Sequence, residues 1–350
     1  MGGALFSISS ALLFVVFVSL SRNVDGKIVQ NGGTCDLFEG NWVWDNSYPL
    51  YHSSQCPFFE DQFNCERNGR PDKDFMKYKW QPTGCKLPRF NGVEFMRKLK
   101  GKRLMFVGDS LSLNQWQSLT CLLHVALPQA KHISYTKDGL SNFTFPEYDV
   151  SLLFLRNTFL VDIVSEPRGR VLRLDSISAS KIWGGMDVVI FDSWHWWLHS
   201  GRKQPWDWVV YGNTTVKDLD RMTAYEKALN TWAKYIDSNV DSTKTQVFFQ
   251  GVSPDHAGGP GSSEKGCEGQ TKPLTSPGSP HPAEHVLEKV LKGMSKHVNL
   301  LNITRLSQLR IDGHPSIYGR FKGQKTNDCT HWCLSGVPDI WNEILYAMLA

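Results

Sequence analysis

The sequence has no strong excess of charge of either sign. It contains 38 Lys and Arg against 34 Asp and Glu, a net charge of +4 over 350 residues, and these charges are spread along the chain rather than gathered into blocks. Without a basic stripe, the sequence predicts no binding of nucleic acid. It also lacks a glycine-rich nucleotide-binding loop, and we predict neither a metal site nor a bound cofactor.

The apolar run at the amino terminus is short for a membrane span. Residues 4–20 are almost wholly apolar, which is near the lower limit of length for crossing a bilayer. The pattern is typical of an export signal within residues 1–24, and Ser19-Leu20-Ser21 offers small residues for cleavage. A cleaved signal peptide and an uncleaved anchor both remain open, and either directs the rest of the chain into the secretory pathway.

No cysteine lies in the export signal, and the number that follows it is even. An even number in an exported chain predicts four disulfides. The cysteines are Cys35, Cys56, Cys65, Cys85, Cys121, Cys267, Cys329 and Cys333. Three glycosylation sequons, at Asn142, Asn213 and Asn302, fit the same compartment.

Apolar periodicity is scarce in residues 27–86, which hold four of the cysteines and many turn-forming residues. We therefore expect a small, cysteine-rich lobe that disulfides hold together. Its aromatic residues either pack against a main domain or form a surface for stacking on sugars. They are Trp42, Trp44, Tyr48, Tyr51, Phe58, Phe59 and Trp80.

From residue 87 to the end, apolar strands alternate with helical patterns. The strands are predicted at residues 103–107, 152–155, 159–163, 187–191, 246–250 and 298–303, and the helices at 93–100, 112–124 and 223–238. This rhythm predicts a three-layer α/β/α domain with a mainly parallel sheet. Residues 258–282 form a long loop rich in Gly, Ser and Pro that contains Cys267.

Gly108-Asp109-Ser110 stands where the strand of residues 103–107 gives way to a helix. A turn of this kind can present a serine hydroxyl at the carboxyl edge of a sheet, beside the first backbone amides of the helix. The alternative is that Asp109 or Ser110 only caps the helix, because both residue types are favoured at helix starts. The backbone amides of Gly108 and Ser110 are the oxyanion donors we propose for a serine nucleophile.

A candidate partner for that serine lies near the carboxyl end, in Asp328-Cys329-Thr330-His331-Trp332-Cys333. Asp328 and His331 are three residues apart, so the carboxylate can orient the imidazole while its other nitrogen takes a serine proton. Cys329, His331 and Cys333 also resemble zinc ligands, but disulfides are the better account behind an export signal. The two motifs together predict a serine-dependent acyl-transfer enzyme.

Tryptophans cluster after the strand of residues 187–191, where the carboxyl edge of the sheet should open. Trp194, His195, Trp196 and Trp197 are candidates for binding a glycan, because aromatic faces stack on sugar rings. Trp206 and Trp208 follow closely. Packing in the core is the alternative role, and we assign about half of these rings to it.

Eight segments of the sequence match a known family. They are CDLFEGNWV at 35–43, NCERNGRPD at 64–72, LPRF at 87–90, GKRLMFVGDSL at 101–111, HWW at 195–197, DGHPS at 312–316, DCTHWC at 328–333 and GVPDIWN at 336–342. In these segments the sequence resembles the plant trichome-birefringence-like family, cell-wall polysaccharide O-acetyltransferases with an SGNH/GDSL-type hydrolase fold. The resemblance covers nearly all of the mature chain. The resemblance implies a catalytic triad of Ser110, His331 and Asp328. It also implies the disulfides Cys35 with Cys85, Cys56 with Cys121, Cys65 with Cys333, and Cys267 with Cys329.

The activity implied by the resemblance is transfer of an acetyl group, through an acetyl-serine, to a plant cell-wall polysaccharide. Xylan or pectin is the expected partner, with mannan and xyloglucan also possible, and the acetyl donor would be acetyl-CoA or a relayed acetyl carrier. A polysaccharide acetylesterase with the same triad and a non-catalytic wall-bridging protein are the alternatives. The expected location is the Golgi lumen, as a type II membrane protein if the signal is uncleaved, or the cell wall after secretion.

One position departs from the family pattern. Many members have Asn-Thr-Gly ahead of His-Trp-Trp, whereas this chain has Asp192-Ser193-Trp194 before His195. An ionised Asp192 could not serve as an oxyanion donor, because a carboxylate repels the developing negative charge. The donor then comes from elsewhere, Asp192 turns away, or turnover is altered, unless Asp192 merely ends a strand.

Overall fold

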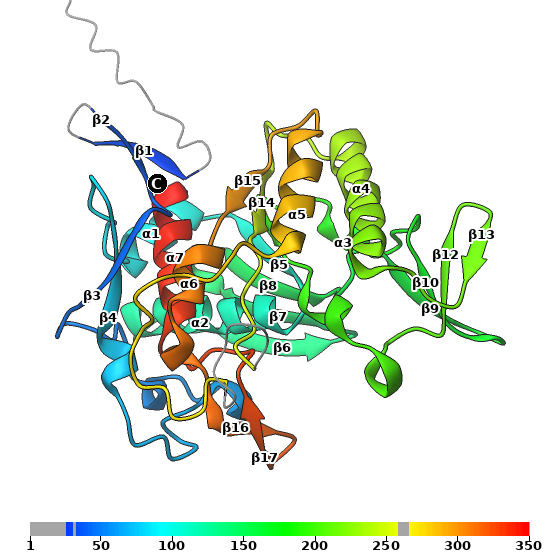
Figure 1. Cartoon of the computed structure of the whole chain (residues 1–350). Coiled ribbons are helices and arrows are strands. Elements are labelled where there is room, and N and C mark those ends of the chain that lie inside the picture. The colour runs from blue at the N-terminus through cyan, green and yellow to red at the C-terminus, as the bar shows by residue number, and fades with distance from the viewer. Residues whose placement is uncertain (1–25, 31–32, 258–265, 350) are drawn as a thin grey trace, which may run out of the picture.

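A seven-stranded sheet forms the centre of the protein (Figure 1). The computed structural model describes residues 26–30, 33–257 and 266–349, so the predicted export signal lies outside the described residues. The strand order is β15 (Asn299–Leu301), β14 (Gln246–Gln250), β11 (Val188–Phe191), β5 (Arg103–Gly108), β8 (Val150–Arg156), β7 (Leu140–Phe145) and β6 (Ile133–Lys137). The strands from β15 to β8 are parallel, and β7 and β6 pair antiparallel.

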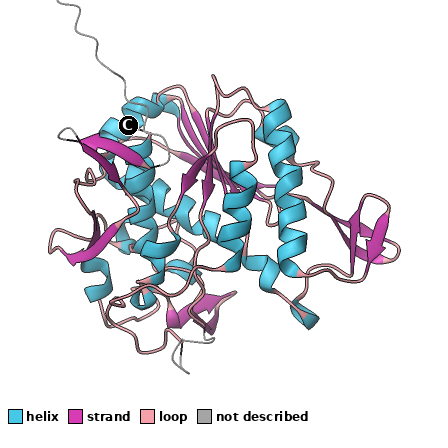
Figure 2. Cartoon of the chain, turned by 45° about the horizontal axis from the view of Figure 1, so that its top comes forward, coloured by secondary structure: helices cyan, strands magenta, loops and turns pink. Residues whose placement is uncertain are grey.

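Both faces of this sheet are apolar. In β5, Leu104 and Phe106 pack into one core, and Met105 and Val107 into the other, because successive side chains of a strand point to opposite faces. One face is covered by α1 (Gly92–Leu99), α2 (Ser110–Ala126), α6 (Thr304–Gln308) and α7 (Val337–Met348), and the other by α3 (Ser180–Trp183), α4 (Arg221–Asn239) and α5 (Pro282–Lys292). Figure 2 shows helices on both sides of the sheet. The predicted three-layer, mainly parallel α/β fold is confirmed.

The amino-terminal lobe packs on α7. It contains the hairpin of β1 (Lys27–Gln30) with β2 (Gly33–Asp36), the pair β3 (Gly40–Trp44) with β4 (Tyr78–Pro82), and the 3-10 helices η1 (Ser53–Gln55), η2 (Asp61–Phe63) and η3 (Asp74–Lys77). The hydroxyls of Tyr48 and Tyr51 donate to Glu343 and Asp339 of α7 at 2.8 and 2.7 Å. Trp80 is buried, whereas Trp44 is exposed. Most of the lobe's aromatic residues are thus packing residues rather than a free sugar-binding surface.

A second, four-stranded sheet projects from the body (Figure 1). Its order is β13 (Thr214–Val216), β12 (Trp208–Tyr211), β10 (Gly169–Arg173) and β9 (Asp162–Glu166). This sheet corrects one prediction, because the strand expected at residues 159–163 begins only at Asp162 and does not join the central sheet. Phe159, Leu160 and Val161 are buried in a turn. A short apolar run shows that residues are buried but does not show that they form a strand.

The other predicted elements are present and differ from the prediction mainly at their ends, whereas α5, α6, β6 and β7 were not predicted. Helix α2 begins two residues earlier than expected, and β15 is shorter than the predicted strand of residues 298–303. Helix α7 has no predicted counterpart, although Val337, Ile340, Trp341, Ile344 and Leu345 recur at helical spacing. Its polar residues Asp339, Asn342 and Glu343 are buried as well. No helix in the described ranges has the length and apolar character to cross a bilayer.

Candidate active site

Ser110 is the first residue of α2, and only Asp109 separates it from the end of β5. Asp109 is the N-cap, and its Oδ1 accepts a hydrogen bond from the Leu111 amide at 2.8 Å. A side chain at Gly108 would bring a Cβ to 2.5 Å from the Asp192 carbonyl oxygen and 2.4 Å from Ser112 Oγ, so only glycine fits this turn. Capping and nucleophile positioning therefore fall to different residues, with Asp109 as the cap and the Ser110 hydroxyl left for other contacts.

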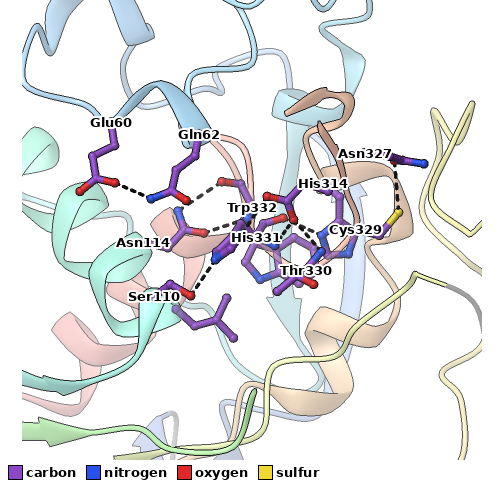
Figure 3. A network of polar contacts seen from close by, with 12 residues as sticks. Glu60, Gln62, Ser110, Asn114, His314, Asn327, Cys329, Thr330, His331 and Trp332 are labelled. Carbon is purple, nitrogen blue, oxygen red and sulfur yellow. Dashed lines mark hydrogen bonds and ion pairs between the residues drawn. The ribbon is translucent and has the colours of Figure 1, made fainter. Parts of the chain in front are cut away.

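Ser110, His331 and Asp328 form a continuous hydrogen-bonded chain. His331 Nε2 lies 2.7 Å from Ser110 Oγ (Figure 3). On the other side of the ring, His331 Nδ1 lies 2.8 Å from Asp328 Oδ2. Asp328 Oδ1 accepts the backbone amides of Thr330 and His331, both at 3.0 Å. The side chains of His331 and Asp328 remain 17% and 15% exposed, so solvent-borne molecules can reach the site. The arrangement is that of a nucleophile, a base and a residue that orients the base.

The pKa values of Asp328 and His331 are shifted in the directions that those roles require. Burial raises the pKa of Asp328, but the His331 ring and the amide hydrogen bonds outweigh burial and hold that pKa well below its usual range. Burial lowers the pKa of His331, and the Asp328 carboxylate, followed by Asp109 and Glu60, raises it above the ordinary value overall. The imidazolium that forms when His331 takes a proton is thus stabilised by its surroundings.

Two disulfides hold the loop that carries His331. Cys267 is bonded to Cys329, and Cys333 is bonded to Cys65 of the amino-terminal lobe. The other two bonds join Cys35 to Cys85 and Cys56 to Cys121, so the four pairs are those that the family resemblance implies. With their sulfurs in disulfides, Cys329 and Cys333 are not free thiolates for a zinc ion, and no cluster of three or more potential metal ligands occurs in the described part of the chain.

Side chains that the sequence analysis did not assign also fix the His331 loop. His314 Nδ1 donates to the backbone oxygen of His331 at 2.7 Å, and the His314 ring stacks on Trp332 with centroids 4.0 Å apart. Asn114 of α2 bonds both the amide and the carbonyl of Trp332, and the Phe63 ring lies against His331. His314 stands in the DGHPS segment at 312–316, the only signal in the sequence that pointed to it.

The tryptophan cluster divides between core and surface. Trp194 and Trp197 are 4% and 0% exposed and pack against Tyr225 of α4, so they have no face to offer a sugar and are corrected to packing residues. His195 and Trp196, at the start of η5 (His195–Leu198), are half-buried. Trp206 is also buried, and Trp208 lies in the projecting sheet with Lys217 3.6 Å above its ring.

Asp192 directly follows β11 and is only 2% exposed. Its backbone amide donates to the Val107 carbonyl at 3.0 Å, which draws it against the end of β5. Its carboxyl group contacts Ser112 Oγ at 3.4 Å, and the nearby charge of Asp109 contributes to raising its pKa. Asp192 therefore does more than end a strand, because it packs against the turn that carries Ser110.

The three sequons differ in accessibility. Asn142 lies within β7 and is 7% exposed, Asn302 is half-buried after β15, and Asn213 is exposed in the turn between β12 and β13. A glycan needs its asparagine amide in solvent, so the burial of Asn142 argues against its modification in the folded protein. Asn213 is the most accessible of the three.

The fold and the site agree with the protein families and relatives to which the sequence is similar. Residues 87–348 match PC-Esterase, a GDSL/SGNH-like acyl-esterase family found in Pmr5 and Cas1p, and residues 33–86 match the PMR5 N-terminal domain. Protein trichome birefringence-like 43 of Arabidopsis thaliana is 58% identical over 328 residues, which cover 90% of this chain and 88% of that protein. This chain belongs to the trichome birefringence-like family.

Other trichome birefringence-like proteins of the same plant are similar over most of their length. Protein trichome birefringence-like 41 is 54% identical over 318 residues, which cover 89% of each chain. Protein trichome birefringence-like 42 is 48% identical over 352 residues, which cover 97% of each. The predicted family is thus confirmed, and the GDSL/SGNH-like acyl-esterase domain indicates an enzyme that transfers or hydrolyses acyl groups.

Proposed function

We propose that this trichome birefringence-like protein is an O-acetyltransferase that acetylates hydroxyls of a plant cell-wall polysaccharide through an acetyl-Ser110 intermediate. The observation that carries the proposal is the unbroken chain from Ser110 Oγ through His331 to Asp328. The acceptor is proposed to be xylan or pectin, and the donor acetyl-CoA or a relayed acetyl carrier. The export signal and the disulfides favour the secretory pathway, in the Golgi lumen or on the way to the wall.

The reaction takes two displacement steps. In the first, Ser110 Oγ attacks the carbonyl carbon of the donor while His331 Nε2 takes the serine proton, and the leaving group departs with that proton. In the second, a sugar hydroxyl gives its proton to His331 as its oxygen attacks acetyl-Ser110. The ester bond to Ser110 breaks, and the proton returns to Ser110 Oγ. Asp328 holds the imidazole in the tautomer that both steps need.

Negative charge develops on the acetyl oxygen in both steps. The amide of Ser110 lies in the first turn of α2, whose amides have no acceptor within the helix, so it is free to bind a developing negative charge beside the nucleophile. We assign the Ser110 amide as the first oxyanion donor. Gly108, the last residue of β5, is paired in register with Arg156 of β8, which leaves its amide the weaker candidate. His195 and Trp196, as the half-buried members of the aromatic cluster, are the proposed contacts for the glycan.

Replacement of Ser110 by alanine tests the proposal. Acetyl transfer should fall by roughly 10³-fold or more, because the nucleophile is lost while the fold and glycan binding remain. Exposed Ser134 of β6, changed to alanine, is the matched control and should keep full activity. Intact-mass spectrometry after exposure to donor should show one added acetyl group on the wild type and none on Ser110→Ala. Transfer that persists in Ser110→Ala would exclude the serine mechanism.

Hydrolysis of acetylated polysaccharide is the second candidate function, favoured by the acyl-esterase description of the matching family. It uses the same first step, with water in place of the sugar hydroxyl in the second. The purified protein should be incubated with acetylated and unacetylated xylan, pectin, mannan and xyloglucan, and the acetate gained or lost by each should be measured. Net gain supports the transferase and net loss the esterase. Glycan binding without any acetyl-serine would instead support a non-catalytic bridging protein.

A further inference from the structure

Two buried carboxyl groups meet beside the nucleophile turn. Val107 of β5 and Phe191 of β11 are partners in adjacent parallel strands, so the residues that follow them emerge at the same edge of the sheet. Asp109 is 0% exposed and Asp192 is 2% exposed. Both carboxyl groups lie against the first turn of α2, Asp109 on the Leu111 amide and Asp192 on Ser112 Oγ, and the charge of Asp109 acts on Asp192. Two ionised carboxylates in this position repel each other, and neither can donate to the other, because a carboxylate only accepts hydrogen bonds.

One oxygen of the two carboxyl groups has no hydrogen-bond donor in the described residues. Asp109 Oδ1 accepts the Leu111 amide, but Asp109 Oδ2 is buried and no donor reaches it from the described residues. Asp192 Oδ2 receives a long contact of 3.4 Å from Ser112 Oγ, and the Ser112 amide also interacts with the Asp192 carboxyl group. Buried acceptors without a donor are costly, and a buried pair of negative charges costs more. A proton on Asp192 would supply the missing donor and remove one of the two charges.

The groups around the two carboxyl groups do not supply the missing hydrogen-bond donor. Tyr225 of α4 lies near both carboxyl groups, but its buried hydroxyl bonds to neither of them in the part of the chain that the structure describes. His195 from η5 and His331 interact with Asp109. Burial lowers the pKa of His195, so its ring stays neutral at ordinary pH, and His331 must be free to accept the serine proton.

We propose that Asp192 carries a proton in the folded enzyme and donates it to Asp109, so that the pair bears one negative charge. Asp192 is then a positioning residue. It holds the Asp109 carboxylate in place as the cap of α2, and the cap sets the direction of Ser110. Burial, followed by the charge of Asp109, raises the pKa of Asp192 well above its ordinary value.

The single charge has consequences for the reaction. The remaining charge, on Asp109, supports the imidazolium of His331, whereas a second charge on Asp192 would oppose the oxyanion that forms beside Ser110. A protonated carboxyl group has nearly the same shape as a carboxamide and can donate as it does. An aspartate at position 192 is therefore compatible with acyl transfer as long as it keeps its proton.

The test compares Asp192→Asn, a permanent donor of the same shape, with the wild type. Asp138→Asn is the control, because Asp138 is an exposed turn residue with φ of 52°, a conformation that asparagine tolerates. Urea unfolding should be measured from pH 5 to pH 9 with each protein. An acid with a raised pKa in the folded state loses its stabilising effect as pH rises. The unfolding constant of the wild type should therefore rise by up to about tenfold per pH unit relative to Asp192→Asn.

Infrared spectroscopy detects directly whether the Asp192 carboxyl group is protonated. The wild-type minus Asp192→Asn difference spectrum should contain the carbonyl band of a buried, protonated carboxylic acid, and the Asp138 control should not. Parallel stability curves for wild type and Asp192→Asn, or the absence of this band, would overturn the proposal. Neither measurement needs a substrate, so a protein that shows the proton but no acyl transfer would contradict the proposed function and support this inference.

Activity tests the positioning role, which rests on the proposed function. Asp192→Asn should keep kcat within a few-fold of the wild type, and Asp192→Leu, which cannot donate, should lose it. The wild type should also lose kcat on the alkaline side as Asp192 ionises, and Asp192→Asn should not show that loss. Equal losses in Asp192→Asn and Asp192→Leu would contradict the positioning role.

Discussion

Removal of the Cys65–Cys333 disulfide should damage both stability and catalysis. Both sulfurs are buried beside Phe75 and Met76, and Cys333 is two residues from His331. The bond closes a separation of 268 residues. Loss of the chain-entropy effect of so long a loop costs up to about 5 to 6 kcal/mol. The value is an upper bound, because the other disulfides shorten the effective loop.

The Cys35–Cys85 disulfide is the matched control. Its separation of 50 residues corresponds to about 4 kcal/mol by the same relation, so the two losses of stability should be similar. The Cys35–Cys85 bond, however, lies at the start of the chain and does not touch the His331 loop. A double change to alanine should therefore lower kcat only for the Cys65–Cys333 pair.

Stability is measured by urea unfolding, and kcat by acetyl transfer at a temperature where each variant is still folded. The folded fraction must be checked, since the expected loss is a large part of the total stability of a typical domain. We expect kcat of the Cys65→Ala/Cys333→Ala variant to fall by at least tenfold, because the His331 loop loses its link to the amino-terminal lobe. Unchanged kcat in that variant, once folded, would refute the idea that the lobe positions His331.

Three further predictions follow from single side chains. Burial raises the pKa of Glu343 to about 7, so its contribution to stability is lost as pH rises from about 4.5 to 7. In urea unfolding, the free energy of unfolding of the wild type should fall by about 3 kcal/mol between pH 4 and pH 8, and that of Glu343→Gln should not. An equal fall in both proteins would contradict this prediction. Asp328→Asn should lower kcat by roughly 10⁴-fold and move the acid limb of kcat/KM to lower pH, because Asp328 raises the pKa of His331. An unmoved limb would argue against that coupling. His314→Leu leaves the His331 carbonyl without its donor and should lower kcat about tenfold with little change in KM, whereas a pure rise in KM would place His314 in substrate binding.

The sequence predicted the elements that depend only on residues close together in the chain. The run of residues 103–107 is apolar at every position but the first, and such a run bounded by glycine is typical of a buried parallel strand. Ser110 could be placed at a strand-to-helix turn from that pattern alone. Asp328 and His331 are three residues apart, so their hydrogen bond also depends on short-range geometry.

The roles of the aromatic residues could not be read in the same way. Trp196 and Trp197 are neighbours of identical chemistry, yet one is half-buried and the other has no exposed surface. Their difference depends on α4 and on Phe159, which come from distant parts of the chain. The run at residues 159–161 failed as a strand for the same reason, since burial in a turn and burial in a strand leave the same composition.

By itself, then, the sequence determined the export signal pattern, the parallel α/β rhythm and the nucleophile turn, because each is written in neighbouring residues. The tertiary structure decided which distant groups meet. It brought His331 to Ser110 across 221 residues and linked the amino-terminal lobe to the His331 loop through Cys65. It also set Asp192 against Asp109, two side chains that follow adjacent strands. These contacts between distant residues depend on strand order and helix packing, which no local sequence pattern encodes.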